Sequence, residues 1–270
     1  MSKISSAIHE IHHIDELSSK DQWVNRIHPL VKLVVTIVYI AAVVSFQKYD
    51  VAGPAGMVIY PIAGFILSEL SFWDSIKRLR FVLPLICFLG IFNLFFDKNH
   101  VLISGIQIDA GILSMITLIL KGFFSVLASY LLIATTSIDK ICYAFRMLHI
   151  PKPMVTQFML TYRYITVLLE EVDRITQAYS LRAPKQKGIH FKVWGSLTGQ
   201  LLLRSMDRAG NVYESMLLRG YNEEYSYMKA LIPVCLKDIV YLLFWVGIVV
   251  LFRIYPVIMI IGNLAGGIFR

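Results

Sequence analysis

The sequence predicts an all-α polytopic membrane protein, with about five transmembrane helices and a cytosolic helical domain inserted before the last one. The first observation is composition: 57% of the 270 residues are hydrophobic and only 16% are charged, with a mean hydropathy of +0.64. Soluble domains carry about 25% charged residues, so we expect the excess apolar surface to face lipid. The other two observations are that the apolar residues cluster into runs and that basic residues flank these runs.

Five apolar runs that are nearly free of charge mark the expected spans. A helix needs about 20 apolar residues to cross a bilayer, and the shorter runs are expected to tilt or to thin the bilayer locally. The runs comprise residues 30–46, 51–70, 81–96, 111–134 and 239–252. Beyond them, residues 254–270 either lengthen the last span or form a sixth element.

The net charge of +8 follows the positive-inside rule rather than a pattern for binding nucleic acid, because the basic residues flank the apolar runs. Their distribution predicts a multi-pass protein of the bacterial inner (cytoplasmic) membrane with a cytosolic N-terminus and an outer C-terminus. Residues 1–29 lack the apolar core of a signal peptide and are expected to remain as a cytosolic segment. The other divisions are a four-span region (30–135), a cytosolic helical domain (136–237), and the last span with its tail (238–270).

Two long amphipathic helices are expected in the cytosolic domain. Each has apolar residues at alternating steps of three and four, which is the spacing of one helical face, and charged residues on the other side. The first helix covers residues 153–178 and the second covers 191–218. The apolar face of the first comprises Phe158, Tyr162, Ile165, Leu169 and Val172, and that of the second comprises Leu202, Met206, Ala209, Tyr213 and Met216.

Both helices end in a short tip made of a leucine, an arginine and a small residue. A single arginine at a helix C-terminus is expected as a cap, because it interacts favourably with the helix dipole. Two such tips on consecutive helices favour a second role, since a guanidinium binds a carboxylate of another protein through two parallel hydrogen bonds. The tips are Leu181-Arg182-Ala183 and Leu218-Arg219-Gly220.

Several motifs around these helices resemble the transmembrane (T) component of energy-coupling-factor ABC transporters, and most of all its cobalt/nickel, CbiQ-like branch. The resemblance runs from about residue 14 to residue 221. Leucine stands where that family has alanine in both tips, and Ala183 stands where it has glycine in the first. The motifs are His28-Pro29-Leu30-Val31-Lys32-Leu33, Thr161-Tyr162-Arg163-Tyr164, Leu169-Glu170-Glu171, Arg204-Ser205-Met206-Asp207-Arg208-Ala209, and Val212-Tyr213-Glu214-Ser215-Met216 with Arg219-Gly220-Tyr221.

The resemblance implies a coupling subunit that works with partners. Two ABC ATPase subunits would each receive one tip in a surface groove, and a separate substrate-binding (S) membrane subunit would pack against this chain. ATP hydrolysis on the ATPases would then drive import of cobalt, or of nickel, in support of cobalamin biosynthesis. An alternative within the class is a T component shared by several vitamin S subunits. The sequence contains no G-x-x-x-x-G-K-[ST] loop, so no ATP site of this kind, no other cofactor and no catalytic residue are expected on this chain.

Two further signals leave alternatives open. His9, Glu10 and His13 match the H-E-x-x-H pattern of zinc proteases, so a membrane metalloprotease is the alternative from another class. A solvated segment or a weak metal-binding tail explains the same residues. Lys121 lies within the fourth apolar run, where a charge is expected to have a function. It either faces the helix bundle or contacts the S subunit.

Overall fold

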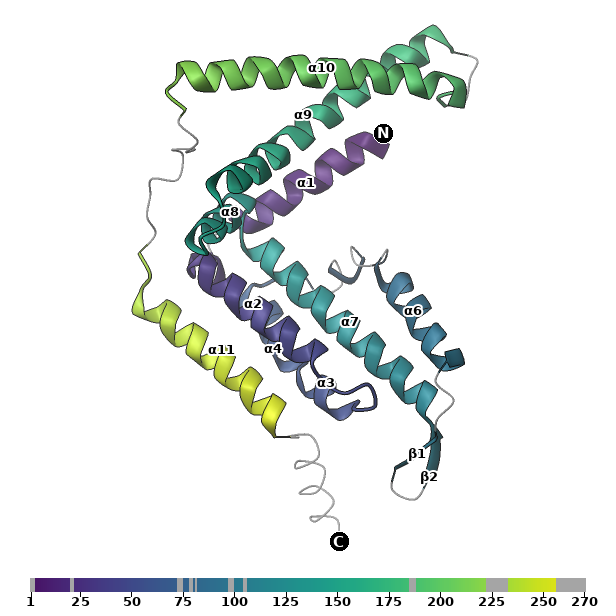
Figure 1. Ribbon diagram of the computed structural model, residues 1–270, viewed down its shortest axis with the longest axis vertical. Coiled ribbons are helices and arrows are strands. Elements are labelled where there is room, and N and C mark those ends of the chain that lie inside the picture. Colours follow the sequence, from purple (N-terminus) through teal and green to yellow (C-terminus); the bar gives the residue numbers. More distant parts are fainter. Residues whose placement is uncertain are drawn as a thin grey trace. The chain divides into compact units, whose positions relative to one another are not determined.

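The computed structural model describes residues 3–19, 22–71, 75–77, 80, 82–96, 100–103, 106–184, 188–221 and 233–255. The chain divides into two compact units (Figure 1). We call the first the peripheral unit; it comprises residues 1–17 and 137–231. The second is the bundle unit, which comprises residues 18–136 and 232–270.

The bundle unit is built from apolar helices and one β-hairpin. Helix α2 packs against both α7 and α11, and α6 packs against α7. The helices are η1 (Val24–Arg26), α2 (Pro29–Val44), α3 (Ala52–Gly56), α4 (Ile59–Leu67), α6 (Val82–Phe96), α7 (Ala110–Thr135) and α11 (Leu236–Ile254), and the strands are β1 (His100–Ile103) and β2 (Ile106–Asp109).

The centre of the bundle unit is an aromatic cluster on α2, α4 and α11. Tyr39 is fully buried, and its hydroxyl donates a hydrogen bond to the carbonyl oxygen of Met57 at 2.8 Å. Its ring lies 4.5 Å from that of Tyr60, and Tyr60 in turn meets Trp245 edge to face at 4.9 Å. Because buried aromatic rings contribute large apolar areas and a buried hydroxyl needs a partner, this cluster fixes the three helices against one another.

The helices of the bundle unit follow the predicted apolar runs, with two differences. The run 51–70 forms two helices, α3 and α4, instead of one. Among the described residues, α7, with 26 residues, is the one helix long and apolar enough to cross a membrane by length and composition; α2, the α3–α4 pair and residues 82–94 form shorter apolar helices. Helix α11 has 19 residues but contains Lys237, Asp238 and Arg253. The number of spans therefore stays a prediction, and residues 256–270 lie outside the described part.

The chain is helical, as predicted, with one addition that the apolar pattern did not indicate. Strands β1 and β2 pair antiparallel, with His100 opposite Asp109 and Ile103 opposite Ile106. The hairpin directly precedes α7.

The peripheral unit consists of long helices with a small core. Its elements are α1 (Lys3–Ser19), α8 (Ile138–Met147), α9 (Lys152–Arg182) and α10 (Phe191–Leu218). The core lies where α8 meets α9 and is formed by Cys142, Val155 and Met159. The N-terminal residues 1–17 are therefore part of the same compact unit as residues 137–231. The predicted side of the membrane for each segment stays a prediction.

The hydroxyl of Tyr162 on α9 ties the N-terminal helix to this unit by donating a hydrogen bond to the carboxylate of Asp15 on α1 at 2.8 Å. Burial raises the pKa of the Tyr162 hydroxyl above its ordinary value, and the hydrogen bond to Asp15 raises it further. The hydroxyl therefore keeps the proton that it donates. Burial likewise raises the pKa of the Cys142 thiol, with a smaller contribution from the charge of Asp139.

Candidate functional site

The first tip lies at the end of α9, which runs for 31 residues without a break. Pro151 precedes the helix, and Pro153 occupies its first turn, where a proline costs no intrahelical hydrogen bond. The helix ends at Arg182, and the amide of Ala183 donates to the carbonyl oxygen of Tyr179 at 3.0 Å. The side chain of Leu181 is 82% exposed, so the tip presents an apolar side chain and an arginine side by side.

Ala183 follows this helix with φ −128° and ψ 60°, which is not the left-handed conformation. A Cβ atom is therefore accommodated there without strain. The backbone at this position therefore accommodates the alanine that stands where the resemblance to T components implies a glycine.

The second tip, at the end of α10, does require a glycine. Gly220 has φ +77°, and its amide donates to the carbonyl oxygen of Leu217 at 2.9 Å. The amide of Tyr221 donates to the carbonyl oxygen of Met216, also at 2.9 Å. These two bonds form a Schellman motif, in which the residue after the C-cap is left-handed. Leu218, directly before the turn, is 89% exposed.

The two tips are chemically alike and lie far apart. Arg182 and Arg219 are both exposed, and neither forms an ion pair with another residue in the described part of the chain. The first tip is near the beginning of α10 and the second is at its end (Figure 1). An α-helix of 28 residues is about 42 Å long, which exceeds the diameter of a small domain, about 30 Å.

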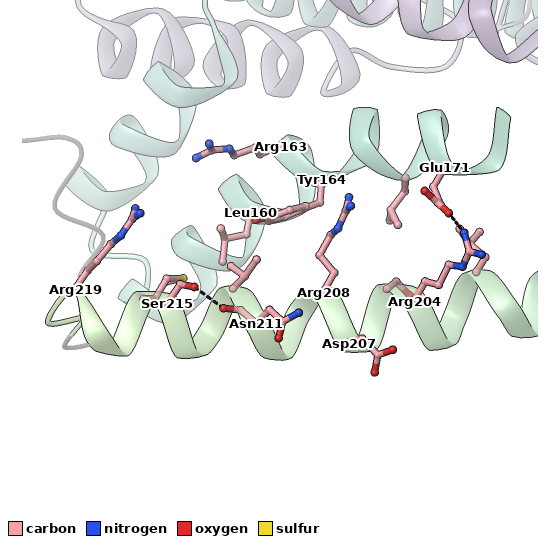
Figure 2. A pocket seen from close by; sticks show the side chains of 15 residues that line it. Leu160, Arg163, Tyr164, Glu171, Arg204, Asp207, Arg208, Asn211, Ser215 and Arg219 are labelled. Carbon is pink, nitrogen blue, oxygen red and sulfur yellow. Dashed lines mark hydrogen bonds and ion pairs between the residues drawn. The ribbon is translucent and has the colours of Figure 1, made fainter. Parts of the chain in front are cut away.

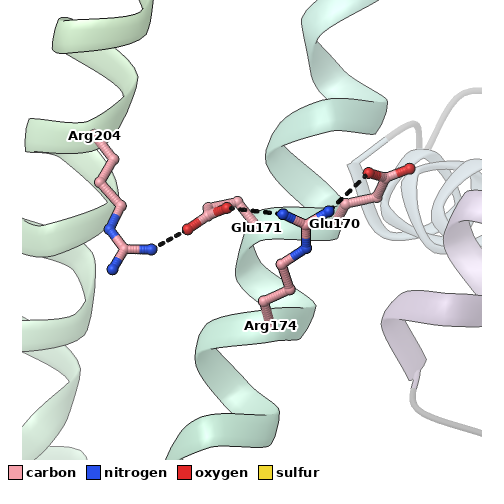
Figure 3. A network of polar contacts seen from close by, with 4 residues as sticks. All are labelled: Glu170, Glu171, Arg174 and Arg204. Atoms are coloured by element: carbon pink, nitrogen blue, oxygen red, sulfur yellow. Dashed lines mark hydrogen bonds and ion pairs between the residues drawn. The ribbon is translucent and has the colours of Figure 1, made fainter.

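Helices α9 and α10 are joined by ionic contacts as well as apolar ones. Glu171 on α9 forms an ion pair with Arg204 on α10 (Figure 3). Glu171 also lies 4.0 Å from Arg174, and Arg174 lies 3.9 Å from Glu170. The Glu171 side chain is only 15% exposed, so it is the central member of this network.

Two grooves line the contact between α9 and α10. One has a volume of about 610 Å³ and is lined by four arginines, Glu171 and Asp207 among other residues. Figure 2 shows Arg208 and Arg219 reaching from α10 towards α9, whereas Asp207 points away. The second groove, of about 510 Å³, is lined mainly by apolar residues such as Ile165 and Met216. Together the grooves give the helix pair one basic side and one apolar side.

The predicted apolar face of α10 is mostly exposed within the described part of the chain. No residue of α10 is buried, and three members of the face are more than half exposed: Leu202 (59%), Met206 (63%) and Tyr213 (56%). A contiguous exposed apolar surface of this kind marks a binding site for protein or membrane. The predicted face of α9 is partly covered, although Phe158 is still 55% exposed.

The structure places Lys121 within the bundle unit. Its ammonium group donates to the carbonyl oxygen of Val44 at 3.2 Å and also to that of Phe46. Val44 is the last residue of α2 and Phe46 lies just after it, at the end where a cation is favoured by the helix dipole. The guanidinium of Arg253 donates to the carbonyl oxygen of Ser45 at 3.1 Å, at the same end of α2. Of the two predicted roles for Lys121, this geometry favours the one within the bundle.

The H-E-x-x-H residues lie on α1. His9, Glu10 and His12 are exposed, and His13 is partly buried. Within the described residues, no group of three or more His, Cys, Asp or Glu side chains has an arrangement suited to a metal ion.

Two buried charged residues, Lys32 and Asp238, had no predicted role of their own. Each is at most 6% exposed in the bundle unit. The signal that could have revealed them is a charge at the edge of an apolar run, since such a residue needs a specific partner.

Two long helices with exposed leucine and arginine tips, in a chain whose other unit is an apolar helical bundle, define a membrane subunit that acts through protein partners. The sequence profile of the CbiQ family, described as "Cobalt transport protein", matches residues 20–230. The chain belongs to this family.

Three relatives have the same curated name, energy-coupling factor transporter transmembrane protein EcfT. The protein from Listeria innocua is 25% identical over 226 residues, covering 74% of this chain and 81% of the relative. The one from Leuconostoc gelidum is 24% identical over 230 residues (75% and 81%), and the one from Lactococcus lactis is 27% identical over 223 residues (74% and 81%). Family and relatives are transporter transmembrane components and not enzymes, which excludes the metalloprotease alternative.

Proposed function

We propose that this chain is the T component of an energy-coupling-factor importer, which transmits ATP hydrolysis on two partner ATPases to a substrate-binding S subunit. The observation that supports this most strongly is the pair of exposed Leu-Arg-small tips, one at the end of α9 and one at the end of α10. Each tip offers an arginine without an ion partner in the described part of the chain, beside an apolar side chain that is more than 80% exposed. Arginine is enriched among the residues that contribute most of the binding energy at protein interfaces.

The distance between the tips supports one ATPase at each tip. A separation of about 42 Å is too large for one small domain to contact both ends of α10. The chain would carry no catalytic residue, bind no nucleic acid and need no cofactor of its own, since ATP would be bound by the partners. The uncovered face of α10, with Leu202, Met206 and Tyr213, is the surface that we assign to the S subunit.

The substrate that we propose is cobalt, with nickel as the chemically similar option. The support is the description of the matching family and the resemblance around the second tip, from Arg204 to Tyr221. The relatives named EcfT favour the alternative, a T component shared by several S subunits, because their names specify no substrate. In either case we place the protein in the bacterial inner membrane with a cytosolic N-terminus.

The test is to purify the tagged chain from detergent-solubilised native membranes and to identify the bound proteins by mass spectrometry. We expect two ABC ATPase chains, or one in two copies, and one small membrane subunit. Uptake of radioactive cobalt and nickel by the same complex in vesicles would then define the metal. Several different S subunits in the eluate would support the shared T component instead. A chain that is recovered without any ATPase would contradict the proposal.

A further inference from the structure

A single buried carboxylate ties together the beginnings of two helices in the bundle unit. Asp238, in the first turn of α11, is 6% exposed. One of its oxygens accepts the amide of Cys235 at 2.8 Å, which completes the cap of α11. The other accepts the amide of His28, the N-cap residue of α2, at 2.9 Å. A negative charge at the N-terminus of a helix is favoured by the helix dipole, and here one charge serves two helices.

A buried ammonium group makes the matching contact one turn further along α2. Lys32 is 4% exposed, and its ammonium group donates to the carbonyl oxygen of Thr135 at 2.7 Å. Thr135 is the last residue of α7, where the dipole favours a positive charge. The residues from His28 to Lys32 therefore hold the end of α7 and the beginning of α11. We call this five-residue segment the anchor.

The anchor is bonded to residues close to two of the three points at which the chain passes between the two units. The crossings fall between residues 17 and 18, between 136 and 137, and between 231 and 232. Thr135 directly precedes the second crossing, and Cys235 and Asp238 follow soon after the third. The first crossing leads along the chain to His28 itself. The second and the third connections thus lead within a few residues to a residue that is bonded to the anchor.

This arrangement affects how a displacement of α9 and α10 would reach the bundle unit. A connection that is not held in place absorbs displacement by changing its own backbone angles, whereas one held by buried hydrogen bonds transmits it. Hydrogen bonds to charged groups are stronger than those between neutral groups, and burial excludes competing water. The anchor has these properties at both described connections.

We propose that the anchor is the fixed point through which the peripheral unit moves the bundle, with Lys32 and Asp238 as its positioning residues. Displacement of α9 and α10 would be passed to α2, α7 and α11 instead of being lost in the connections. The inference rests on the proposed function, because it assumes that the peripheral unit is driven by ATPases.

The test compares variants of the assembled complex in proteoliposomes, with ATP hydrolysis and uptake of radioactive cobalt or nickel measured on the same sample. Lys32→Met removes the ammonium donor, and Asp238→Asn removes one of the two acceptors. The matched control is Arg253→Met, which removes a cation-to-carbonyl hydrogen bond at the opposite end of α2. Lys32→Arg retains a donor and tests rescue.

We expect Lys32→Met and Asp238→Asn to keep the wild-type ATPase rate and to lower the uptake per ATP by about tenfold, the effect of losing one hydrogen bond to a charged group. Arg253→Met should keep the wild-type uptake per ATP, and Lys32→Arg should retain most of that uptake per ATP. An unchanged ratio in Lys32→Met and Asp238→Asn would overturn the inference. An equal loss in Arg253→Met would also overturn it, because the effect would then be general weakening of the bundle.

A second measurement needs neither variants nor a known substrate. Hydrogen exchange of the wild-type complex with and without ATP should leave the amides of His28 and Cys235 protected in both states. Rapid exchange of these amides in the ATP-bound state would mean that the anchor opens, which contradicts the inference while leaving the coupling function intact. A wild-type chain that binds no ATPase would contradict the proposed function itself, and the inference with it.

Discussion

Helices α2 and α10 show how differently the two units use their apolar residues. Eight of the 16 residues of α2 are buried, including Tyr39 and Val43, which have no exposed surface. Helix α10 has 28 residues and none is buried. Both helices carry apolar side chains along their length, but within the described part of the chain only α2 has such side chains buried.

The difference indicates that the bundle unit is internally packed, whereas α10 is one half of an interface. Burial of a leucine side chain contributes about 1.5–3 kcal/mol to stability, and the apolar side chains of α10 contribute little of this in the isolated chain. Their contribution is expected on assembly. The following variants test this comparison, beginning with the largest expected effect.

Truncation of a leucine should separate the two regions most clearly. Leu127 on α7 is 2% exposed and Leu202 on α10 is 59% exposed. We expect Leu127→Ala to lower the free energy of unfolding by about 2–5 kcal/mol, because it leaves a cavity. Leu202→Ala should change it by less than about 0.5 kcal/mol. Denaturant unfolding of the purified chains in detergent measures both values, and comparable losses would contradict the comparison.

A charge on the α10 face should weaken assembly without affecting the fold. We expect Met206→Asp to reduce recovery of the membrane partner subunit by about thirtyfold, or about 2 kcal/mol, since it places a charge in the centre of the assigned interface. Ser196→Asp, at another exposed position of α10, is the control. Quantitative mass spectrometry of the purified complexes gives the ratio, and equal recovery with both variants would show that the partner binds elsewhere.

Substitution by valine should lower stability more at the second tip than at the first. Gly220→Val places a branched residue at φ +77° and should cost about 1–2 kcal/mol, the penalty of a left-handed conformation. Ala183→Val, at φ −128°, should cost less than about 0.5 kcal/mol. Hydrogen exchange at the amides of Gly220 and Tyr221 reports the loss of the Schellman bonds. Unchanged protection in Gly220→Val would contradict the assigned geometry.

The smallest effect is expected at the ionic contact between α9 and α10. Glu171→Gln removes the ion pairs with Arg174 and Arg204, which should cost no more than about 1 kcal/mol because both arginines are mostly exposed. The difference from wild type should disappear at about 1 M salt, where exposed charges are screened. Thermal unfolding at low and high salt measures this difference in stability. The control is Glu170→Gln, which removes only an ion pair within α9. A loss that is independent of salt would indicate that Glu171 acts by packing.

Local features of the chain could be read from the sequence, and contacts between distant residues could not. The amphipathic pattern gave the bounds of α10 correctly and those of α9 within a few residues, since periodicity and flanking prolines are local signals. The division of residues 51–70 into α3 and α4 was missed because the run is apolar on all sides. It therefore has no helical periodicity whose interruption would have marked the break. The bonds of Lys32 to Thr135 and of Asp238 to His28 join residues 103 and 210 positions apart.

The tips illustrate the same division between local and distant information. Their residues and their repetition are visible in the sequence, as is the substitution of Ala183 for glycine. That the first tip does not need a glycine depends on the backbone angles at the end of α9, which the sequence alone does not specify. The roles of Arg182 and Arg219 in binding ATPases stay predictions.

Charge reversal of the two tip arginines tests the central claim most directly. Arg182→Glu and Arg219→Glu would be purified from native membranes, together with Lys192→Glu as a control at an exposed site in the first turn of α10. We predict that each tip variant loses at least about thirtyfold in bound ATPase, as expected for an interfacial arginine that is replaced by a carboxylate, while the control binds as wild type. Normal ATPase binding and normal metal uptake in both tip variants would contradict the account.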